Sequence, residues 1–571
     1  MACKRKYLTE EEIVIALEED LPSDIDTPVE SSSDEELENN PNVAGSSESQ
    51  NVQLSDTSSS DEETFSVIQR NWRKKPISKS LPVFSKEVGP VLQHFVGKET
   101  AADIFLTVLS ESTIENVVFQ TNLYIQQKQL RVKPVDTREM LSFMGLHFFF
   151  GYHRLPHMRH YWSSEMDFST PIVPKAMQRD RYFEILANLH VNDNSAIPKD
   201  NCDKLFKIRP LIQDLNRNFQ MLRLPNEVQS IDESMVLFKG RSSLKQYNPM
   251  KPIKRGYKIW CRADMTGYVY EFEIYQGKSQ DTNNSKARFG LGGSIVDRLT
   301  HSLRGCGYVV MMDNYFTSVE LFEHMKANKI FACGTVRSNR KHLPKLQEDK
   351  KLQRGDFDYS STEQGITFFK WRDNKCVHLL SNYHGNEATT LSRQERNGTR
   401  KDVVAPAIVG DYNYSMGGVD KADMLRSLYD PDRKSKKWWH RLFFAMIEMA
   451  YVNAFVIYKE IHHESTLLEF RRNLAMGLIA QGKIPVKKKG RPSISTTPEQ
   501  PKKRRKNNFS VSKDIRRQNL GAHWPTFVQE RGRCEMCSTK KIQSKPHSKC
   551  SFCNVFLCCN EKKNCFYEYH V

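Results

Sequence analysis

The sequence predicts an α/β core with an insertion, flanked by two mostly helical segments and followed by a small Cys-rich module. Three observations carry this prediction. Apolar residues recur at helical spacing over 84–228 and 437–463, strand-like runs occupy 229–336, and seven of the thirteen cysteines lie between Cys534 and Cys565. A chain of 571 residues is too long for a single hydrophobic core, so several domains are expected.

The N-terminal region, residues 1–83, differs in composition from the rest. Residues 1–65 hold 18 Asp and Glu against three Lys and Arg, and SSSDEE occurs at 31–36 and 58–63. Such a polar segment buries too little apolar surface to fold, so we expect disorder, with the serines as phosphorylation sites or part of a solubilising tail. The whole chain carries +17, so the remainder carries +32. This indicates a polyanionic partner such as nucleic acid; a merely solvated basic surface is the alternative.

The chain shows no sign of membrane targeting. No segment approaches about 18 consecutive apolar residues, and the start, MACKRKYLTEEE, lacks the apolar stretch of a secretory signal. We therefore expect no membrane partner and an intracellular protein with reduced thiols.

The first helical segment is predicted from three stretches, 139–156, 179–191 and 207–222, whose apolar residues follow helical spacing. Strands are predicted at 229–241, at 257–277 with a turn at Thr266-Gly267, and at 308–313 and 330–336, with a helix over 318–329. Residues 338–403 are polar and irregular, with a few strand-like pieces such as ITFFKWRD (366–373) and KCVHLLSN (375–382), and are expected to form the insertion. The stretch 437–463 is apolar nearly all round, which predicts a buried helix.

Carboxylates fall at structurally informative places in this pattern. Asp232 lies inside the first strand, and Asp313 ends the run YVVMM. In MGGVDKADML, Asp420 and Asp423 share a face if a helix begins near Val419. Converging carboxylates without a partnered His or Cys suit Mg²⁺, and two such ions support in-line phosphoryl displacement. The alternatives are that Asp313 caps the next helix and that Asp232 is a satisfied polar residue.

Five segments, in this order, resemble the piggyBac family of DNA transposases: SIDESMVLFKGR, KPIKRGYKIW, MDNYFTS, CGTVRSNR and MGGVDKADML. The resemblance covers about 84–571. It implies an RNase H-like catalytic domain of the DDE/DDD type at 229–337 and 404–424, interrupted by an insertion domain at 338–403. It also implies a split dimerisation and DNA-binding domain at 84–228 and 425–482.

The resemblance further implies a reaction and its residues. Asp232, Asp313 and Asp420 would hold two Mg²⁺ ions, with Asp423 as a further functional carboxylate. The family's cut-and-paste reaction nicks transposon ends at their terminal inverted repeats, forms hairpins and joins 3′-OH ends to TTAA targets, carried out here by a homodimer. Two alternatives are a domesticated DNA-binding protein that does not cut, and a chromatin or ubiquitin adaptor that works through the Cys-rich end.

Several residues are candidates for DNA contact. The resemblance places Trp438 next to the transposon end, with Trp439 as the one-residue alternative; a core position at the helix start would explain either. Lys254, Arg255 and Lys258 in KPIKRGYK would hold phosphates, or form a charged strand edge. Arg337 and Arg340 of CGTVRSNR complete the set.

The basic linker, 483–530, predicts nuclear import. Residues 483–517 hold 13 Lys and Arg against two acids, and PKKRRK at 501–506 is an import-type cluster. We therefore expect import machinery as a partner and the nucleus as location. VKKKGRPS at 486–493 resembles a minor-groove AT-hook.

The C-terminal module, residues 531–571, predicts zinc. Two Cys-x2-Cys pairs at this spacing in a reduced protein are typical of zinc sites. Seven ligands are expected: Cys534, Cys537, Cys550, Cys553, Cys558, Cys565 and His570. Cys559, His547 and His523 are candidates for an eighth, so one or two Zn²⁺ ions are expected, in an interleaved cross-brace if there are two. The resemblance implies that this module binds subterminal transposon DNA.

Overall fold

A computed structural model of the chain describes residues 70–75, 78–249, 253–277, 284–395, 399–431, 435–463, 465–482, 511–518, 520–539 and 543–571. The predictions of an AT-hook and an import cluster fall on residues 486–493 and 501–506, outside the described residues, as do residues 1–69 of the tail predicted to be disordered over 1–83. For residues 78–83 that prediction is wrong, because the N–H of Ser80 donates to the carbonyl of Tyr383 and Leu81 packs against a buried core.

A nine-stranded mixed sheet forms the centre of the α/β part. Its order is β6-β5-β3-β7-β8-β11-β10-β9, and β4 shares the outer edge of β5 with β6. The strands are β3 Val228–Leu237, β4 Gln246–Tyr247, β5 Arg255–Ala263, β6 Val269–Ile274, β7 Val309–Met312, β8 Phe331–Thr335, β9 Phe357–Ser361, β10 Thr367–Arg372 and β11 Cys376–Ser381. β3, β7 and β8 run parallel to one another, whereas β5 and β6 are antiparallel neighbours. The strands expected at 229–241, 257–277, 308–313 and 330–336 are thereby confirmed.

The parallel strands are buried because helices cover both faces. α8 (Asn284–Leu299) and α9 (Val319–Ala327) pack on one face through a core that includes Val310 and Met312. α10 (Ala407–Ser415) packs on the other face with Val309 and Met311. Alternate residues of β7 thus enter two cores, so this strand reads as a continuous apolar run.

The β5–β6 connection is the tight turn that the Thr266-Gly267 pair predicts. The carbonyl of Asp264 accepts a hydrogen bond from the N–H of Gly267 at 3.0 Å. Gly267 has a φ of +87°, a left-handed conformation that favours glycine.

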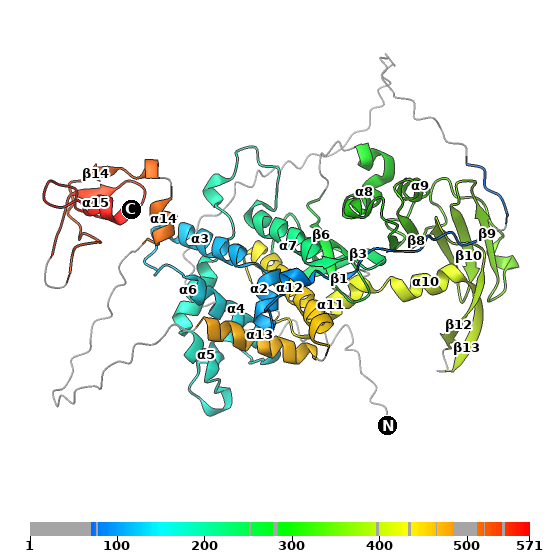
Figure 1. The fold of residues 1–571 in the computed structure, drawn as a ribbon, viewed down its shortest axis with the longest axis horizontal. Helices are drawn as coiled ribbons and strands as arrows, with labels where there is room; N and C mark the ends of the chain where they lie inside the picture. Colours follow the sequence, from blue (N-terminus) through cyan, green and yellow to red (C-terminus); the bar gives the residue numbers. More distant parts are fainter. Residues whose placement is uncertain are drawn as a thin grey trace, which may run out of the picture. The chain divides into compact units, whose positions relative to one another are not determined.

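The predicted insertion, 338–403, is joined to the sheet. Leu379 of β11 pairs with Thr335 of β8, so β11, β10 and β9 extend the same sheet outward. Only β12 (Ala388–Gln394) and β13 (Arg400–Pro406) form a separate hairpin. From β13 the chain passes through α10 into α11 (Gly418–Leu428), as Figure 1 shows.

Helices from the two flanking segments form one packed unit. They are α2 Ala101–Val108, α3 Glu111–Gln127, α4 Thr137–Tyr152, α5 Ile172–Ala176, α6 Arg179–Asn188, α7 Arg209–Leu222, α12 Trp438–His462 and α13 Leu467–Gln481, with the short pair β1 Gly89–Pro90 and β2 Arg223–Leu224. α13 packs along α4, and α12 packs against α2 and α7. By length and composition alone α12 could cross a membrane, but 83% of its most apolar window is buried within the described fold.

A buried ion-pair network ties these helices together. Glu448 of α12 accepts hydrogen bonds from Arg471 of α13 at 2.7 Å and lies 2.9 Å from Nε2 of His147 on α4. All three side chains are almost completely buried. Burial raises the pKa of Glu448, but Arg471 and His147 outweigh it and lower the pKa to about 2. The carboxylate therefore stays charged and links segments more than 300 residues apart in sequence.

The C-terminal module is small and loop-rich. It begins before the predicted boundary at 531, because β14 (Pro525–Phe527) pairs with β15 (Ser548–Cys550) and Ile515 of α14 (Lys513–Arg517) lies in the same core. Its last element is α15 (Cys565–His570). The buried side chains include five cysteines alongside a few apolar residues such as Val555 and Leu557. So little apolar core favours stabilisation by a bound metal.

Candidate active site and zinc module

The sheet register sets Asp232 beside Asp313. Ile231 of β3 pairs with Met312 of β7 in parallel, so the next residue of each strand is a carboxylate. Residues paired in register point to the same face, and neighbouring strands lie about 4.8 Å apart. By the same rule Cys261, which pairs with Asp232, and Thr335, which follows Gly334, extend this line across four strands. We call Cys261, Asp232, Asp313 and Thr335 the carboxylate row.

Asp313 sits in a turn that fixes its carboxylate. Its Oδ1 accepts a hydrogen bond from the N–H of Tyr315 at 2.9 Å, and its carbonyl accepts one from Thr317 Oγ1 at 2.9 Å. The following helix, α9, is capped by Ser318, whose side chain accepts from the N–H of Leu321. Asp313 is therefore not the helix cap that the sequence left open as an alternative.

Two arginines brace the same turn. Arg337 Nε donates to Oδ1 of Asn314 at 2.9 Å, and Arg340 Nη2 donates to the carbonyls of Asn314 and Tyr315 at 2.8 Å each. Both arginines were expected to contact DNA, and in the structure both bond to the residues that follow Asp313.

Asp232 is anchored locally, and its neighbour faces the opposite side of the sheet. Asp232 Oδ1 accepts the N–H of Glu233 at 2.7 Å. Glu233 forms an ion pair with Lys258, whose Nζ lies 4.5 Å from the Tyr315 ring centroid. The Lys258 side chain is only 16% exposed. Its charge is thus balanced inside the protein, which weakens its candidacy as a phosphate contact.

α11 lies close against β3 because a glycine allows it. A Cβ placed on Gly418 would come within 2.6 Å of Ser230 Oγ. One turn on, Asp423 Oδ1 accepts a hydrogen bond from Ser234 Oγ at 2.7 Å and pairs with Arg426 at 3.0 Å. Ser234 is two residues from Asp232 on the same face of β3.

Asp420 behaves differently from Asp423. It lies in the first turn of α11, as predicted, but on the exposed arc of the helix. Among the described residues, the sets of three or more potential metal ligands within 4.8 Å of one another lie in the C-terminal module. The structure therefore joins Asp232 to Asp313 and attaches Asp423 to β3, but does not draw Asp420 into a tight cluster with them.

Tyr412 of α10 completes the surroundings of the row. Burial raises the pKa of its phenol, and the nearby carboxylates of Asp313 and Asp232 add to the effect. Burial, with Asp423 and Asp232 nearby, likewise raises the pKa of the Cys261 thiol. The carboxylates thus concentrate negative charge in one place, where a cation would be stabilised.

The remaining DNA-contact candidates differ in exposure. Lys254 and Arg255 are exposed at the start of β5. Trp438, the first residue of α12, is partly exposed, whereas Trp439 is 4% exposed and packs against His190 and Phe443. Trp439 is therefore a core residue, and Trp438 is the more accessible of the two.

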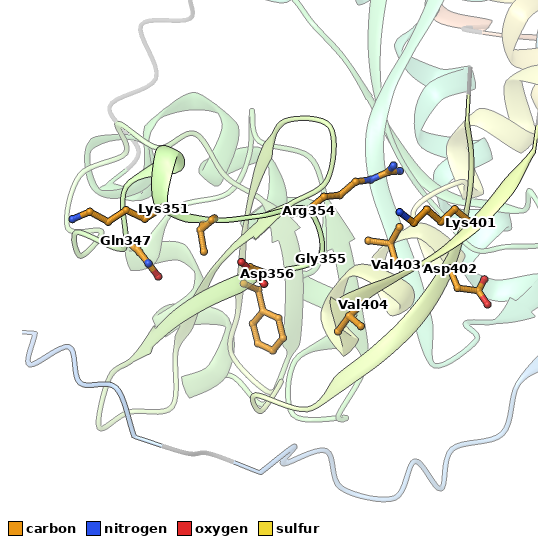
Figure 2. Close-up of a pocket in the computed structure, with 11 residues that line it drawn as sticks. Gln347, Lys351, Arg354, Gly355, Asp356, Lys401, Asp402, Val403 and Val404 are labelled. Atoms are coloured by element: carbon orange, nitrogen blue, oxygen red, sulfur yellow. The ribbon is translucent and has the colours of Figure 1, made fainter. Parts of the chain in front are cut away.

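A cavity of about 600 Å³ lies apart from the row, between the chain that leads into β9 and strand β13. Figure 2 shows Arg354 and Lys401 at one end of it and Gln347 and Lys351 at the other. Arg354 is paired with Asp373 and Glu395. The lining includes no member of the carboxylate row.

The C-terminal module brings eight potential zinc ligands into two clusters. One holds Cys534, Cys537, Cys558 and Cys565, and the other holds His523, Cys550, Cys553 and His570. The three cysteine pairs alternate along the chain between the clusters, and His523 and His570, before and after them, join the same cluster, so the two sites are interleaved as in the expected cross-brace. Of the three candidates for the eighth zinc ligand, His523 is the one that lies in a cluster.

The distances within the clusters fit tetrahedral zinc. Sulfur atoms of Cys537 and Cys558 lie 3.7 Å apart, and His523 Nδ1 lies 3.4 Å from the sulfurs of Cys550 and Cys553. A zinc–sulfur bond of about 2.3 Å gives tetrahedral ligand separations of about 3.8 Å. The donor set and its spacing therefore suit zinc.

Both histidines are oriented by their second ring nitrogen. His570 Nδ1 lies 2.7 Å from the carbonyl of Phe566, and His523 Nε2 lies 3.0 Å from the carbonyl of Gln518. Such hydrogen bonds fix the tautomer of a metal-binding imidazole. The other two candidates lie outside the clusters: His547 is 2.7 Å from Arg531 Nε, and Cys559 belongs to neither set.

Some of these residues gave no clear signal in the sequence. His523 stands eleven residues before Cys534, outside any regular ligand spacing. Tyr412 and Arg426 were not singled out, because an aromatic or a basic residue on a helix has many ordinary roles. Only the folded register brings them to the carboxylates.

Comparison with known proteins is consistent with this geometry. A family model described as Transposase IS4 matches residues 100–455, more than half of the chain. The chain is 34% identical over 413 residues to PiggyBac transposable element-derived protein 3 of Homo sapiens, covering 71% of this chain and 68% of that protein. It is 29% identical over 515 residues to PiggyBac transposable element-derived protein 2 of Homo sapiens, covering 88% and 82%.

A solved structure shares the fold. The chain resembles a protein in the cryo-EM structure of a piggyBac transposase synaptic complex with hairpin DNA, with a TM-score of 0.61, 23% identity, and coverage of 83% of this chain and 98% of that one. At this identity the likeness concerns the fold alone. Together, the family match, the sequence relatives and the shared fold establish that the chain belongs to the piggyBac family of transposases.

Proposed function

We propose that the protein is a DNA transposase that nicks transposon ends, forms hairpin intermediates and joins 3′-OH ends to TTAA targets. The observation that carries this proposal is the register that sets Asp232 beside Asp313 on one face of the sheet, with α11 packed against the same strand. Family membership supplies the reaction class.

The catalytic core in this proposal is RNase H-like. Support comes from five strands in the order β6-β5-β3-β7-β8, three antiparallel neighbours followed by two parallel ones. Asp232 lies in the central strand of this set, β3, and Asp313 directly follows its parallel neighbour β7. Each carboxylate is oriented by a backbone N–H, which is the rigidity that metal geometry requires.

Asp232, Asp313 and Asp420 would hold two Mg²⁺ ions, which suit an all-oxygen donor set and polarise phosphate oxygens when bound. Asp420 would turn inward from its exposed place at the start of α11. Asp423, balanced by Arg426 and bound to Ser234, would hold α11 on β3. Arg337 and Arg340 would keep the turn of Asp313 in place.

DNA would be held outside this row. Trp438 offers a partly exposed ring on which a base could stack, an interaction worth about 1–3 kcal/mol. Lys254 and Arg255 would contact phosphates. The zinc-loaded C-terminal module would bind subterminal DNA. A homodimer in the nucleus, imported through the clusters in 483–530, completes the proposal.

An excision assay tests this proposal. The substrate is a plasmid carrying the repeats that flank the gene for this chain. We expect excision that restores TTAA, and its loss in Asp313→Asn, which keeps an oxygen for the Tyr315 N–H but removes the charge. The matched control is Asp193→Asn, because Asp193 accepts the N–H of Ser195 at 2.8 Å in a similar turn outside the sheet. Equal excision by Asp313→Asn and the unmodified chain would overturn the assignment.

The alternative function is a domesticated DNA-binding protein without cleavage. It is favoured by the names of the human relatives, which describe them as derived from transposable elements. In this case the chain would shift the mobility of the same terminal repeats but excise nothing, with Asp193→Asn and Asp313→Asn binding equally.

A further inference from the structure

A segment before the first helix fastens α10 to the sheet. We call residues 78–81 the strap. The N–H of Ser80 donates to the carbonyl of Tyr383 at 2.9 Å, and the N–H of Lys79 donates to Glu387 Oε1 at 2.8 Å. Leu81 packs into the apolar core that α10 shares with β7. The strap is thus bonded to the chain that follows β11 and reaches the core beneath α10.

The strap also contacts α10 itself. Lys79 Nζ lies 2.9 Å from Asp411 Oδ2, and His384 Nε2 lies 3.0 Å from the same oxygen. On its other side, His384 Nδ1 lies 2.8 Å from Ser381 Oγ at the end of β11. Two donors from different segments therefore converge on one carboxylate. His384 and Ser381 are almost completely buried, so this end of the network is rigid.

The helix held in this way leads to the carboxylate row. Asp411 directly precedes Tyr412, which packs against the core that contains Val309 and Met311 of β7. α10 ends at Ser415, and α11, which carries Asp420 and Asp423, begins three residues later. A displacement of α10 would therefore move both Tyr412 and the start of α11 relative to the strands.

We propose that the strap positions the carboxylate face, with the Lys79–Asp411 pair as its fastening to α10. The part of this inference that concerns catalysis rests on the proposed function. Lys79 is a positioning residue, because it touches α10 and not the row. Positioning matters because a displacement of about 1 Å in a reacting group can cost about 100-fold in rate.

The strap region offers its own matched control. Lys74 also forms an ion pair, with Asp358 Oδ1 at 2.7 Å, but Asp358 belongs to β9 at the far edge of the sheet. Asp358 is also the less exposed partner, at 8% against 40% for Asp411. If Lys74 and Lys79 served only stability, Lys74→Met would be at least as damaging as Lys79→Met.

The test compares Lys79→Met, Lys79→Arg and Lys74→Met in the full chain. Hydrogen exchange, read by mass spectrometry over residues 407–415, is expected to accelerate at least about threefold in Lys79→Met and to stay unchanged in Lys74→Met and Lys79→Arg. Strand cleavage of terminal-repeat DNA is expected to fall about 10-fold at saturating DNA in Lys79→Met alone, with DNA affinity unchanged.

The outcomes separate this inference from the proposed function. Exchange in α10 is measured without any activity, so it decides the positioning of α10 even if the unmodified chain cuts no DNA. Unchanged exchange in Lys79→Met, or equal acceleration in Lys74→Met, would overturn the strap. Faster exchange with full cleavage activity would show that Lys79 holds α10 in place but that α10 does not position the row. This result would overturn the part of the inference that concerns catalysis.

Discussion

The two candidate metal sites of this chain reach their geometry by opposite routes. In the C-terminal module eight Cys and His side chains already lie in two clusters, and the ligand atoms of each cluster are within 4.8 Å of one another. In the α/β core, Asp232 and Asp313 are brought together by strand register, while Asp420 stays on the exposed arc of α11.

Two properties explain this difference: the charge of the ligand side chains and the amount of folded core that supports each site. Thiols and imidazoles can be neutral and pack like small apolar groups, so they can gather before a metal binds. Carboxylates that approach to hydrogen-bond distance repel one another unless a cation lies between them. The module has little core besides its ligands, whereas the row rests on a sheet that is buried on both faces. The module should therefore depend on its metal for folding, and the row only for activity.

The largest expected effect is the loss of zinc. Chelation with EDTA, or Cys553→Ser, should unfold the C-terminal module, because zinc binding contributes about 10–16 kcal/mol in small zinc domains. Exchange of amides in 523–570 would report the unfolding. The helices and the sheet should keep their protection; if chelation unfolds them equally, the two regions do not differ as described.

The next effect concerns the body of the protein. Glu448→Gln should destabilise it by about 3–5 kcal/mol, because Arg471 would remain buried without its charge partner. Denaturant unfolding followed by tryptophan fluorescence measures this. The same change should leave zinc content unaltered.

This effect should also depend on pH. The pKa of Glu448 is lowered to about 2, against about 4.3 for an unfolded Glu. The stabilisation is therefore full above the unfolded value and is lost as pH falls toward 2. The stability gap between Glu448→Gln and the unmodified chain should narrow from pH 6 to pH 3; a constant gap would contradict the charged assignment.

The row should show the reverse of the module. Asp232→Asn should lower DNA cleavage at least about 100-fold, yet leave the melting temperature unchanged or slightly raised, because it removes a repelling charge and keeps an oxygen for the Glu233 N–H. Differential scanning calorimetry and a cleavage assay measure the two quantities. A large fall in melting temperature would mean that the row supports folding as well.

The smallest effect separates two adjacent cysteines. Cys558→Ser should release zinc and loosen the module, whereas Cys559→Ser should keep full zinc content and change stability by less than about 0.5 kcal/mol. Zinc analysis of the two purified variants decides it. Zinc loss in Cys559→Ser instead would reverse the ligand assignment.

The sequence predicted those elements that a local residue pattern specifies. Apolar spacing predicts the strands around Asp232 and Asp313 and the helix at 437–463. The Cys-x2-Cys spacing is typical of zinc ligands. The sequence did not predict contacts between residues that only folding brings together. His523 has no spacing signal, the pairing of Glu448 with Arg471 joins two helices, and Ser318, not Asp313, caps α9 because the turn between them is occupied by Asx bonding.

The insertion illustrates the same limit. Residues 338–403 look irregular in sequence, and yet β9–β11 extend the central sheet. Strand pairing across distant segments depends on which edge is left open, and here β8 offers that edge to β11. No property of ITFFKWRD or KCVHLLSN alone specifies this neighbour.

The central claim is that Asp232 and Asp313 bind a divalent cation together. Anomalous diffraction from crystals of the full chain soaked in Mn²⁺ tests it most directly. The account predicts a manganese peak within about 2.2 Å of a carboxylate oxygen from each residue, with Asp420 turned toward it. Manganese elsewhere on the protein and none at the row would contradict it.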